Sequence, residues 1–442
     1  MTRIDKSKHA LLFALTFLAI GVLFSQENTI DLKAIEKKIS ERLGEKGIAF
    51  PFELGKGEES CGSDFDSDGI QDFASTVRFT GSPKDESENF RDQDGFLSLF
   101  FGDGKRGIRS DVLLPIVPCD SCGGVYGRPE VALQCKGATV KVQSYGGSNW
   151  RWANSEILRW KSGNWQWIGS DSYSYHTYFG DGIKTSLNRI NLDANREYEG
   201  RSNPEIPELP SRGPIRFKKI VSFRSNGDSE KDSKEEDTPA LPFSIETPDW
   251  ISDKKPDWKG AADLSFKIAS RWDPQRLFLN VEVADDSILA CSEGKTDCDS
   301  IEIILDSDPS LLDIGPDGGL RKTPGKRWAK IVLPVRNEEG KWKFDAKSSA
   351  KDRINVKFVK TKSGYTISCG IPWSRWIENP RTNPPRVGSV FLATVSVLDF
   401  DFPGDKGKTM SSSEIRGKDP FTFGELELSE KPYSLGGYRK GE

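Results

Sequence analysis

Four aspartates in one short stretch are the strongest candidate for metal chemistry in this sequence of 442 residues. They stand at positions 1, 3, 5 and 9 of residues 64–72, and a glycine at position 6 permits a sharp turn. A hard cation such as Ca²⁺ takes six to eight oxygen ligands, which clustered carboxylates on one tight loop supply. The spacing therefore predicts a calcium site; the alternative is a solvated acidic turn. The predicted ligands are Asp64, Asp66, Asp68, Asp72 and the backbone carbonyl of Ile70.

The loop departs from the EF-hand at position 12, where that motif has a bidentate glutamate and this chain has Ser75. It resembles instead the D-x-D-x-D-G loops of FG-GAP and VCBS-type secreted β domains, in which a strand follows the loop. Residues 73–79 have the composition of such a strand. The resemblance implies a structural calcium, because clustered carboxylates repel one another unless a cation neutralises them.

The N-terminus has the pattern of an export signal. Arg3, Lys6 and Lys8 precede an uncharged apolar stretch at residues 11–24, and the small residue Ser25 follows it. An uncleaved membrane anchor, the alternative, normally needs about 20 apolar residues. We therefore expect a signal peptide over residues 1–25 and a secreted or periplasmic protein without a membrane span after cleavage.

Export changes the interpretation of the cysteines, because thiols can pair in an oxidising compartment. Cys119 and Cys122 form a C-x-x-C pair, which a redox motif or half of a zinc knuckle would also contain. A second C-x-x-C pair is missing from the sequence, so structural disulfides are favoured, with the connectivity of the first four left open. Cys369 lies in an alternating run and is expected to be a buried free thiol. The disulfide candidates are Cys61, Cys119, Cys122, Cys135, Cys291 and Cys298.

Only two histidines occur, and His9 lies in the predicted signal. Metal sites that need several imidazoles are therefore excluded, and a catalytic triad could use only His176. His176 lies in a Tyr-rich segment without a candidate nucleophile, so a plain polar contact is expected for it. With 63 basic against 67 acidic residues the net charge is −4, which argues against a nucleic-acid partner.

Two kinds of periodicity indicate how these residues are positioned. Apolar residues spaced by three and four from Leu32 to Leu43 predict one short amphipathic helix that is capped by Thr29 or Asp31. Alternating apolar residues then predict an all-β chain of two domains: a compact N-terminal β domain and a C-terminal antiparallel, jelly-roll-like β-sandwich. The predicted segments are residues 26–200 for the helix and first domain, residues 201–240 for a Pro-rich and charged linker, and residues 241–432 for the sandwich. The apolar piece at residues 215–223 is assigned to either neighbour.

Five tryptophans between residues 150 and 167 allow two interpretations. They could form a platform on which sugar rings stack, or they could fill a small β core, which is favoured because alternating aromatics usually do so. Residues 55–200 also resemble a domain found in exported bacterial proteins of unassigned function, a resemblance that implies no activity.

The C-terminal region resembles a family 9 carbohydrate-binding module of the DOMON-like β-sandwich group over about residues 255–430. The motifs that carry the resemblance are residues 262–265 (ADLS), 272–286, 299–302 (DSIE), 364–373, 387–388, 399–401 (DFD) and 419–428. The resemblance implies sugar binding between two stacking tryptophans. This chain has Thr296 and Gly417 at about those positions, which leaves Trp328, Trp342 and Trp376 as substitutes.

The acidic residues of this region have two interpretations. A pair of carboxylates could serve a glycosidase; alternatively they bind a second calcium or end strands at turns, which is favoured. These residues are Asp263, Asp285, Asp286, Asp299, Glu302, Asp306, Asp399 and Asp401.

The sequence predicts an exported, non-catalytic carbohydrate-binding protein whose sandwich binds a sugar or glycan, with calcium in the first domain. One alternative is a glycoside hydrolase or its accessory subunit in carbohydrate catabolism. A second is an envelope structural or interaction protein, with a protein partner, that has lost sugar binding. A haem-binding DOMON protein is a remote option, because the region from residue 241 onwards contains no histidine.

Overall fold

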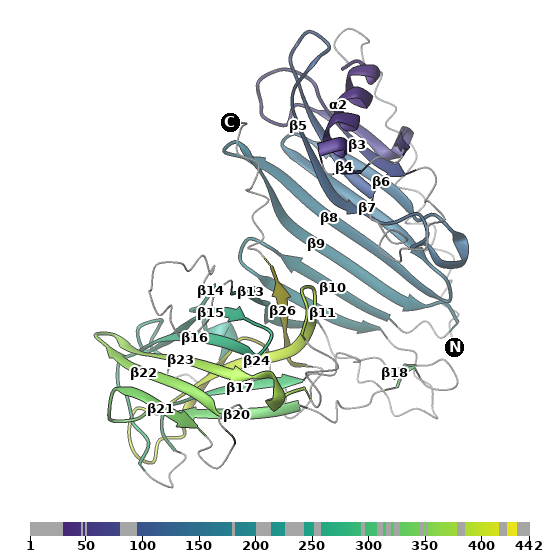
Figure 1. Ribbon diagram of the computed structural model, residues 1–442. Helices are drawn as coiled ribbons and strands as arrows, with labels where there is room; N and C mark the ends of the chain where they lie inside the picture. Colours follow the sequence, from purple (N-terminus) through teal and green to yellow (C-terminus); the bar gives the residue numbers. More distant parts are fainter. Residues whose placement is uncertain are drawn as a thin grey trace, which may run out of the picture.

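The structure is a computed structural model that describes the chain in segments. These are residues 30–45, 47–48, 51–79, 95–178, 182–199, 214–225, 243–251, 258–292, 297–306, 313–314, 320–321, 328–344, 349, 352–377, 385–414 and 422–430. They form a mostly β structure with one N-terminal helix and three large sheets, here named A, B and C (Figure 1). The predicted signal at residues 1–25 lies outside the described residues. Within them, no helix is long and apolar enough to cross a bilayer.

Helix α2 (Leu32–Glu45) confirms the predicted amphipathic helix. Its apolar stripe of Ile35, Ile39 and Leu43 is buried against sheet A, while the charged side chains between them face water. Asp31 caps it by accepting a hydrogen bond from the backbone N–H of Lys33 at 3.1 Å.

Sheet A and sheet B pack face to face and form the N-terminal core. Sheet A has the order β1-β3-β4-β5, with β2 also paired to β3, and sheet B is an antiparallel meander in the order β12 to β6. The strands of sheet A are β1 (Phe52–Leu54), β2 (Ser60–Ser63), β3 (Asp72–Phe79), β4 (Gly95–Gly102) and β5 (Ile108–Val117). Those of sheet B are β6 (Glu130–Lys136), β7 (Thr139–Gly147), β8 (Trp150–Lys161), β9 (Asn164–His176), β10 (Gly182–Asn188), β11 (Asp193–Glu199) and β12 (Ile215–Lys218). Phe65, Leu97, Phe101, Leu158 and Trp165 fill the space between the two sheets.

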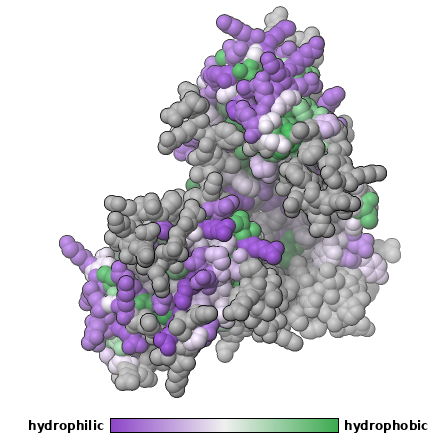
Figure 2. All heavy atoms as spheres, viewed as in Figure 1, coloured by the Kyte–Doolittle hydropathy of each residue, from purple (hydrophilic) through white to green (hydrophobic). Residues whose placement is uncertain are grey.

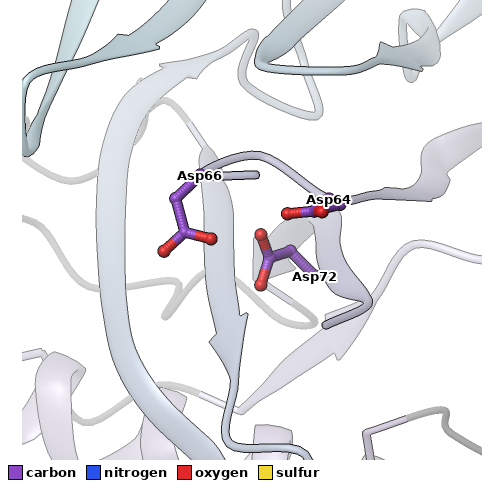
Figure 3. Close-up of side chains that lie close together, drawn as sticks. All are labelled: Asp64, Asp66 and Asp72. Carbon is purple, nitrogen blue, oxygen red and sulfur yellow. The ribbon is translucent and has the colours of Figure 1, made fainter. Parts of the chain in front are cut away.

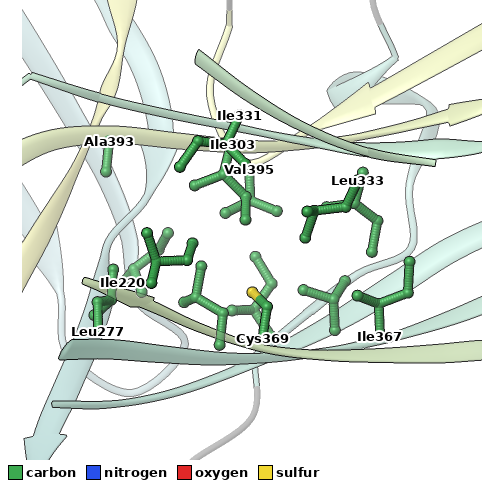
Figure 4. Packing of buried hydrophobic residues seen from close by; sticks show 14 of the residues in the cluster. Ile220, Leu277, Ile303, Ile331, Leu333, Ile367, Cys369, Ala393 and Val395 are labelled. Atoms are coloured by element: carbon green, nitrogen blue, oxygen red, sulfur yellow. The ribbon is translucent and has the colours of Figure 1, made fainter. Parts of the chain in front are cut away.

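Sheet C curls into the predicted β-sandwich. One layer brings Ile303, Ile331 and Val395 against Ile367 and Cys369 of the other, and the space between them is apolar (Figure 4). Its path runs β20-β17-β24-β26-β13-β15-β16-β23-β22-β21, with β14 beside β15 and β25 beside β24. The strands are β13 (Ile220–Arg224), β14 (Phe243–Ile245), β15 (Leu264–Trp272), β16 (Arg276–Asp285), β17 (Ser300–Asp306), β20 (Trp328–Pro334), β21 (Gly340–Phe344), β22 (Ile354–Thr361), β23 (Gly364–Pro372), β24 (Val390–Asp399), β25 (Lys408–Ser411) and β26 (Gly424–Ser429). A separate pair is formed by β18 (Asp313–Ile314) and β19 (Leu320–Arg321).

The two domains meet directly at residues 215–224. The sequence predicts these residues to lie within a linker and does not decide which neighbouring domain their apolar piece belongs to. In the structure, β12 belongs to sheet B. Strand β13 lies between β26 and β15 of sheet C and is parallel to both. Only Lys219 separates the two strands. The backbone N–H of Lys218 donates to the carbonyl of Ser412 at 2.7 Å, so β12 also hydrogen-bonds to the sandwich. The linker prediction is therefore wrong for residues 215–224, because their apolar side chains are buried in both domains.

The six candidate cysteines are all paired, which confirms them as disulfides and settles the connectivity that the sequence leaves open. Cys61 pairs with Cys135, Cys119 with Cys122, and Cys291 with Cys298. The first of these joins sheet A to sheet B, since Cys61 lies in β2 and Cys135 in β6. Cys369 is a buried free thiol, as predicted, and burial raises its pKa to about 12.

Candidate functional site

The predicted calcium loop is a tight turn that ends at the start of β3. Asp64 accepts hydrogen bonds from the backbone N–H groups of Asp68 and Gly69 at 3.1 and 2.9 Å. Gly69 has φ of +82°, a conformation that favours glycine. Ile70 is joined to the loop through its N–H, which donates to Asp68 at 2.8 Å. These bonds bend the chain so that its carboxylates lie on one side.

Three of the four predicted aspartates converge. Asp64, Asp66 and Asp72 each offer an oxygen atom within 4.8 Å of the others (Figure 3). Asp72 is fully buried and accepts from the N–H groups of Phe65 and Gly102 at 2.7 and 2.9 Å, and its burial raises its pKa to about 6. Oδ1 of Asp66 is buried and, among the described residues, has no hydrogen-bond partner. This donor set of hard oxygens fits Ca²⁺.

Arg109 is a further cationic group at this loop, which the sequence does not single out. Its guanidinium donates to Asp68 at 2.8 Å and also contacts Asp66. The pKa of Asp68 is lowered, mainly by the hydrogen bond from Ile70 and then by Arg109. Asp68 therefore pairs with Arg109, an arginine 41 residues further along the chain. No local sequence pattern could reveal this pairing.

The sandwich holds a second acidic cluster around Lys408. Its ammonium group lies 3.0 Å from Asp263, 3.3 Å from Asp399 and 3.0 Å from Asp401. Burial disfavours the charged lysine, but hydrogen bonds to Asp401 and Asp263 raise its pKa. Lys408 has no motif of its own, and it enters the cluster because β25 pairs with β24, which sets Lys408 opposite Asp399.

Asp399 also belongs to a deeper group with Asp285 and Asp299, whose oxygens lie within 4.8 Å of one another. All three side chains are at most 5% exposed. Burial and the neighbouring carboxylates raise the pKa of Asp299 to about 8 and that of Asp399 to about 7. Burial and mutual repulsion therefore favour the protonated form of these carboxyl groups. The same three oxygens could also hold a metal ion, which is the alternative that the sequence favours.

The candidate sugar-stacking tryptophans have different outcomes. Trp376 is 3% exposed and packs against Trp373 in the sandwich core, so it offers no free face to a sugar and that candidate is wrong. Trp328 begins β20, opposite Asp306, and Trp342 lies in β21, opposite Val356. Thr296 and Gly417, together with the side chains of Trp328 and Trp342, lie outside what the structure describes.

One ion pair lies on the outer face of the sandwich where β17 meets β20, beside the buried apolar residues Ile304, Leu392 and Phe423. Glu302 forms an ion pair with Lys330 of the neighbouring strand, and these side chains are 16% and 41% exposed. Glu302 also lies opposite Ser396 of β24. Glu302 alternates with the core residues Ile301 and Ile303, a sequence signal that places it outside the core.

Three of the five tryptophans of the N-terminal domain, Trp160, Trp165 and Trp167, pack at its core, and Trp150 and Trp152 lie at the other end of β8. Trp160 and Trp165 pack in the core with ring centroids 5.7 Å apart, and Trp167 donates its Nε1–H to Glu156 at 2.6 Å. Trp150 lies edge-on to His176, which is buried and accepts a hydrogen bond from the N–H of Tyr178. The core interpretation therefore holds for Trp160 and Trp165, and His176 makes the expected polar contact.

Comparisons with known proteins agree with the resemblance of the C-terminal region. Residues 245–431 match the family model described as carbohydrate family 9 binding domain-like. A carbohydrate-binding module of family 9 from Caldicellulosiruptor kristjanssonii in complex with cellotriose is 15% identical, with a TM-score of 0.32 over 51% of this chain and 100% of its own. A second structure of such a module from the same organism, in complex with glucose, is 16% identical, with a TM-score of 0.32 over 50% and 100%. No curated protein sequence matches the chain.

Proposed function

We propose that this chain, whose residues 245–431 are a domain of carbohydrate binding module family 9, is an exported, non-catalytic protein that binds a sugar or glycan through its C-terminal sandwich. The family match is the observation that carries the proposal. The two family 9 structures bind cellotriose and glucose, which suggests a neutral glycan as the ligand class. Asp285, Asp299 and Asp399 are at most 5% exposed, and this burial favours binding over hydrolysis.

The best-supported place for the ligand is the outer face at β17 and β20. A sugar site needs aromatic surface and a few polar groups that reach the sugar hydroxyls. Lys330 and Glu302 supply a donor and an acceptor at this face. Trp328 belongs to the same strand as Lys330, two residues earlier, and remains our candidate for stacking at this face. Trp342, in β21 opposite the buried Val356, remains a candidate at a separate place on the sandwich.

We also propose that Ca²⁺ binds the loop of residues 64–72 and that the protein acts in the periplasm or outside the cell. The convergence of Asp64, Asp66 and Asp72 and the unsatisfied oxygen of Asp66 support the metal. Three disulfides are consistent with an oxidising compartment.

The full-length mature chain is the right material for the binding test, because β13 and the junction belong to the sandwich. Isothermal titration calorimetry with cellotriose and glucose, preceded by a glycan array, should give saturable binding. Lys330→Ala should weaken that binding by about tenfold, the equivalent of about 1.4 kcal/mol. Lys267→Ala, an exposed lysine of β15, serves as the matched control and should leave binding unchanged.

Lack of binding to every glycan of the array would contradict the proposal and favour the structural or interaction alternative. Release of reducing sugar from a bound polysaccharide, lost in a carboxylate variant, would favour the hydrolase instead.

A further inference from the structure

Strands β8, β9 and β10 of sheet B continue beyond the region that packs against sheet A (Figure 1). There the face that carries the core residue Leu158 is partly exposed. Two cross-strand rows form it. Trp152, Ser174 and Ile183 lie opposite one another in the first row, and Asn154, Ser172 and Thr185 in the second. Asn154 and Ser172 are exposed, and the other four side chains are half-buried. We call these six residues the neutral face.

Trp152 is held in place by a glycine on the neighbouring strand. It pairs with Gly146 of β7, and a Cβ atom at Gly146 would lie 2.6 Å from Cζ2 of the indole. The same Cβ would lie 3.1 Å from the Cα of Gly123, in the loop that follows the Cys119–Cys122 disulfide. The missing side chain therefore lets the indole lie across the sheet beside this loop. A fixed, half-exposed indole is a ready surface for the C–H groups of a sugar ring.

The neutral face differs in chemistry from the opposite face of the same strands. On the side of sheet B that faces away from the core, strands β9, β10 and β11 carry the exposed charged residues Asp171, Lys184 and Glu197. The six residues of the neutral face are uncharged, and four of them offer hydroxyl or amide groups. The charged residues beside them on the same side of the sheet are Glu156, which is half-buried and bonded to Trp167, and Arg196 opposite Thr185, which is buried. Exposed sheet surface is ordinarily rich in charge. An uncharged, hydrogen-bonding surface with an indole is complementary to an uncharged polyhydroxylated ligand and not to an ionic one.

We infer that the neutral face is a second carbohydrate-binding surface, in the N-terminal domain, for a neutral glycan. The inference rests on the proposed function only for the ligand class. The lobe of α2 and sheet A and the lobe of the sandwich project on either side of a recessed surface (Figure 2). Sheets B and C are hydrogen-bonded to each other at β12. A glycan chain that binds both surfaces therefore contacts two sites that are fixed relative to each other.

Affinity electrophoresis of the full-length mature protein in gels containing xylan, hydroxyethylcellulose, glucomannan or mixed-linkage β-glucan tests this inference. Asn154→Arg places a bulky charge on the neutral face at an exposed position, where folding should tolerate it. Asn195→Arg is the matched control, since Asn195 is an exposed asparagine on the opposite face of β11. We expect Asn154→Arg to weaken retardation by at least one polysaccharide about tenfold, and Asn195→Arg to match the wild type. Trp152→Ala should act like Asn154→Arg, with its melting temperature measured alongside.

The variant Lys330→Ala separates this surface from the site on the sandwich. Retardation that survives Lys330→Ala and is lost when Asn154→Arg is added supports the neutral face. Retardation abolished by Lys330→Ala alone supports the sandwich site and overturns this inference. Equal behaviour of Asn154→Arg and Asn195→Arg in every gel, or no retardation of the wild type in any gel, overturns it as well.

Discussion

Arg196 of β11 lies within contact of Glu425 of β26, although 229 residues separate them. The arginine is 2% exposed; besides Glu425 it donates to the carbonyl of Phe423 at 3.1 Å, and its guanidinium lies over the ring of Phe217. Lys219 adds an ion pair to Glu427 at 2.7 Å. A buried charge with this many partners ties the N-terminal sheet B to the sandwich.

We therefore expect Arg196→Met to destabilise the protein. Removing one partner of a buried ion pair leaves the other charge buried without its partner, at a cost of about 3 kcal/mol. Urea unfolding followed by tryptophan fluorescence should show a lower midpoint and the separation of one transition into two. Lys184→Met is the control, since Lys184 and its partner Glu199 form a more exposed pair within sheet B. An unchanged single transition for Arg196→Met would mean that the junction contributes little.

The family match begins at residue 245, which leaves the central strand β13 outside it. A fragment of residues 240–432 lacks Ile220, Val221 and Phe223, all buried, and leaves the edges of β15 and β26 unpaired. Unpaired edges are sites of aggregation. We expect this fragment to aggregate or to melt well below a fragment of residues 214–432, as measured by size-exclusion chromatography and circular dichroism. Equal melting temperatures would show that β13 is dispensable.

Removal of calcium should destabilise the N-terminal domain, because Asp64, Asp66 and Asp72 repel one another without a cation. EDTA should lower the melting temperature by several degrees, and the shift should be lost in Asp66→Asn but retained in Glu197→Gln, an exposed control on β11. Arg109→Gln should raise calcium affinity, since the guanidinium competes with the ion for Asp66 and Asp68. An identical melting temperature with EDTA and with excess Ca²⁺ would contradict the site.

The stability of the sandwich should fall as the pH rises. Burial and neighbouring carboxylates raise the pKa of Asp299 to about 8, against about 3.9 in an unfolded chain, so between these values the folded state binds more protons. Linkage then requires the free energy of unfolding to decrease across about pH 4 to 8. Asp299→Asn should flatten that dependence, measured by urea unfolding at pH 5 and pH 8, whereas Asp286→Asn, at an exposed neighbour, should not. A stability that increases with pH in the wild type would contradict the protonated cluster.

The sequence reveals those features whose physical cause is local. Spacing of three and four buries Ile35, Ile39 and Leu43 on one side of a helix. Alternation turns Glu302 away from the core, between the buried Ile301 and Ile303. The D-x-D-x-D-G spacing makes a turn because Gly69 permits its backbone, and the ordered motifs of the C-terminal region lead to its family.

Local patterns cannot reveal partners that only long-range pairing brings together. The tertiary structure decides that Cys61 bonds to Cys135, that Lys408 enters the acidic cluster and that Arg109 reaches Asp66 and Asp68. It also buries Trp376, a candidate for sugar stacking, because the core closes around it.

By itself the sequence therefore determined the β class, the helix, the acidic turn and the family of the sandwich, since periodicity and spacing act over a few residues. Only the tertiary structure decided that residues 215–224 join the two domains. It also decided that Trp165 is buried in the core while Trp152 lies half-exposed on the neutral face. Strand order and register determine which side chains, distant in sequence, share one face of a sheet. The residues next to a position in the chain do not determine this.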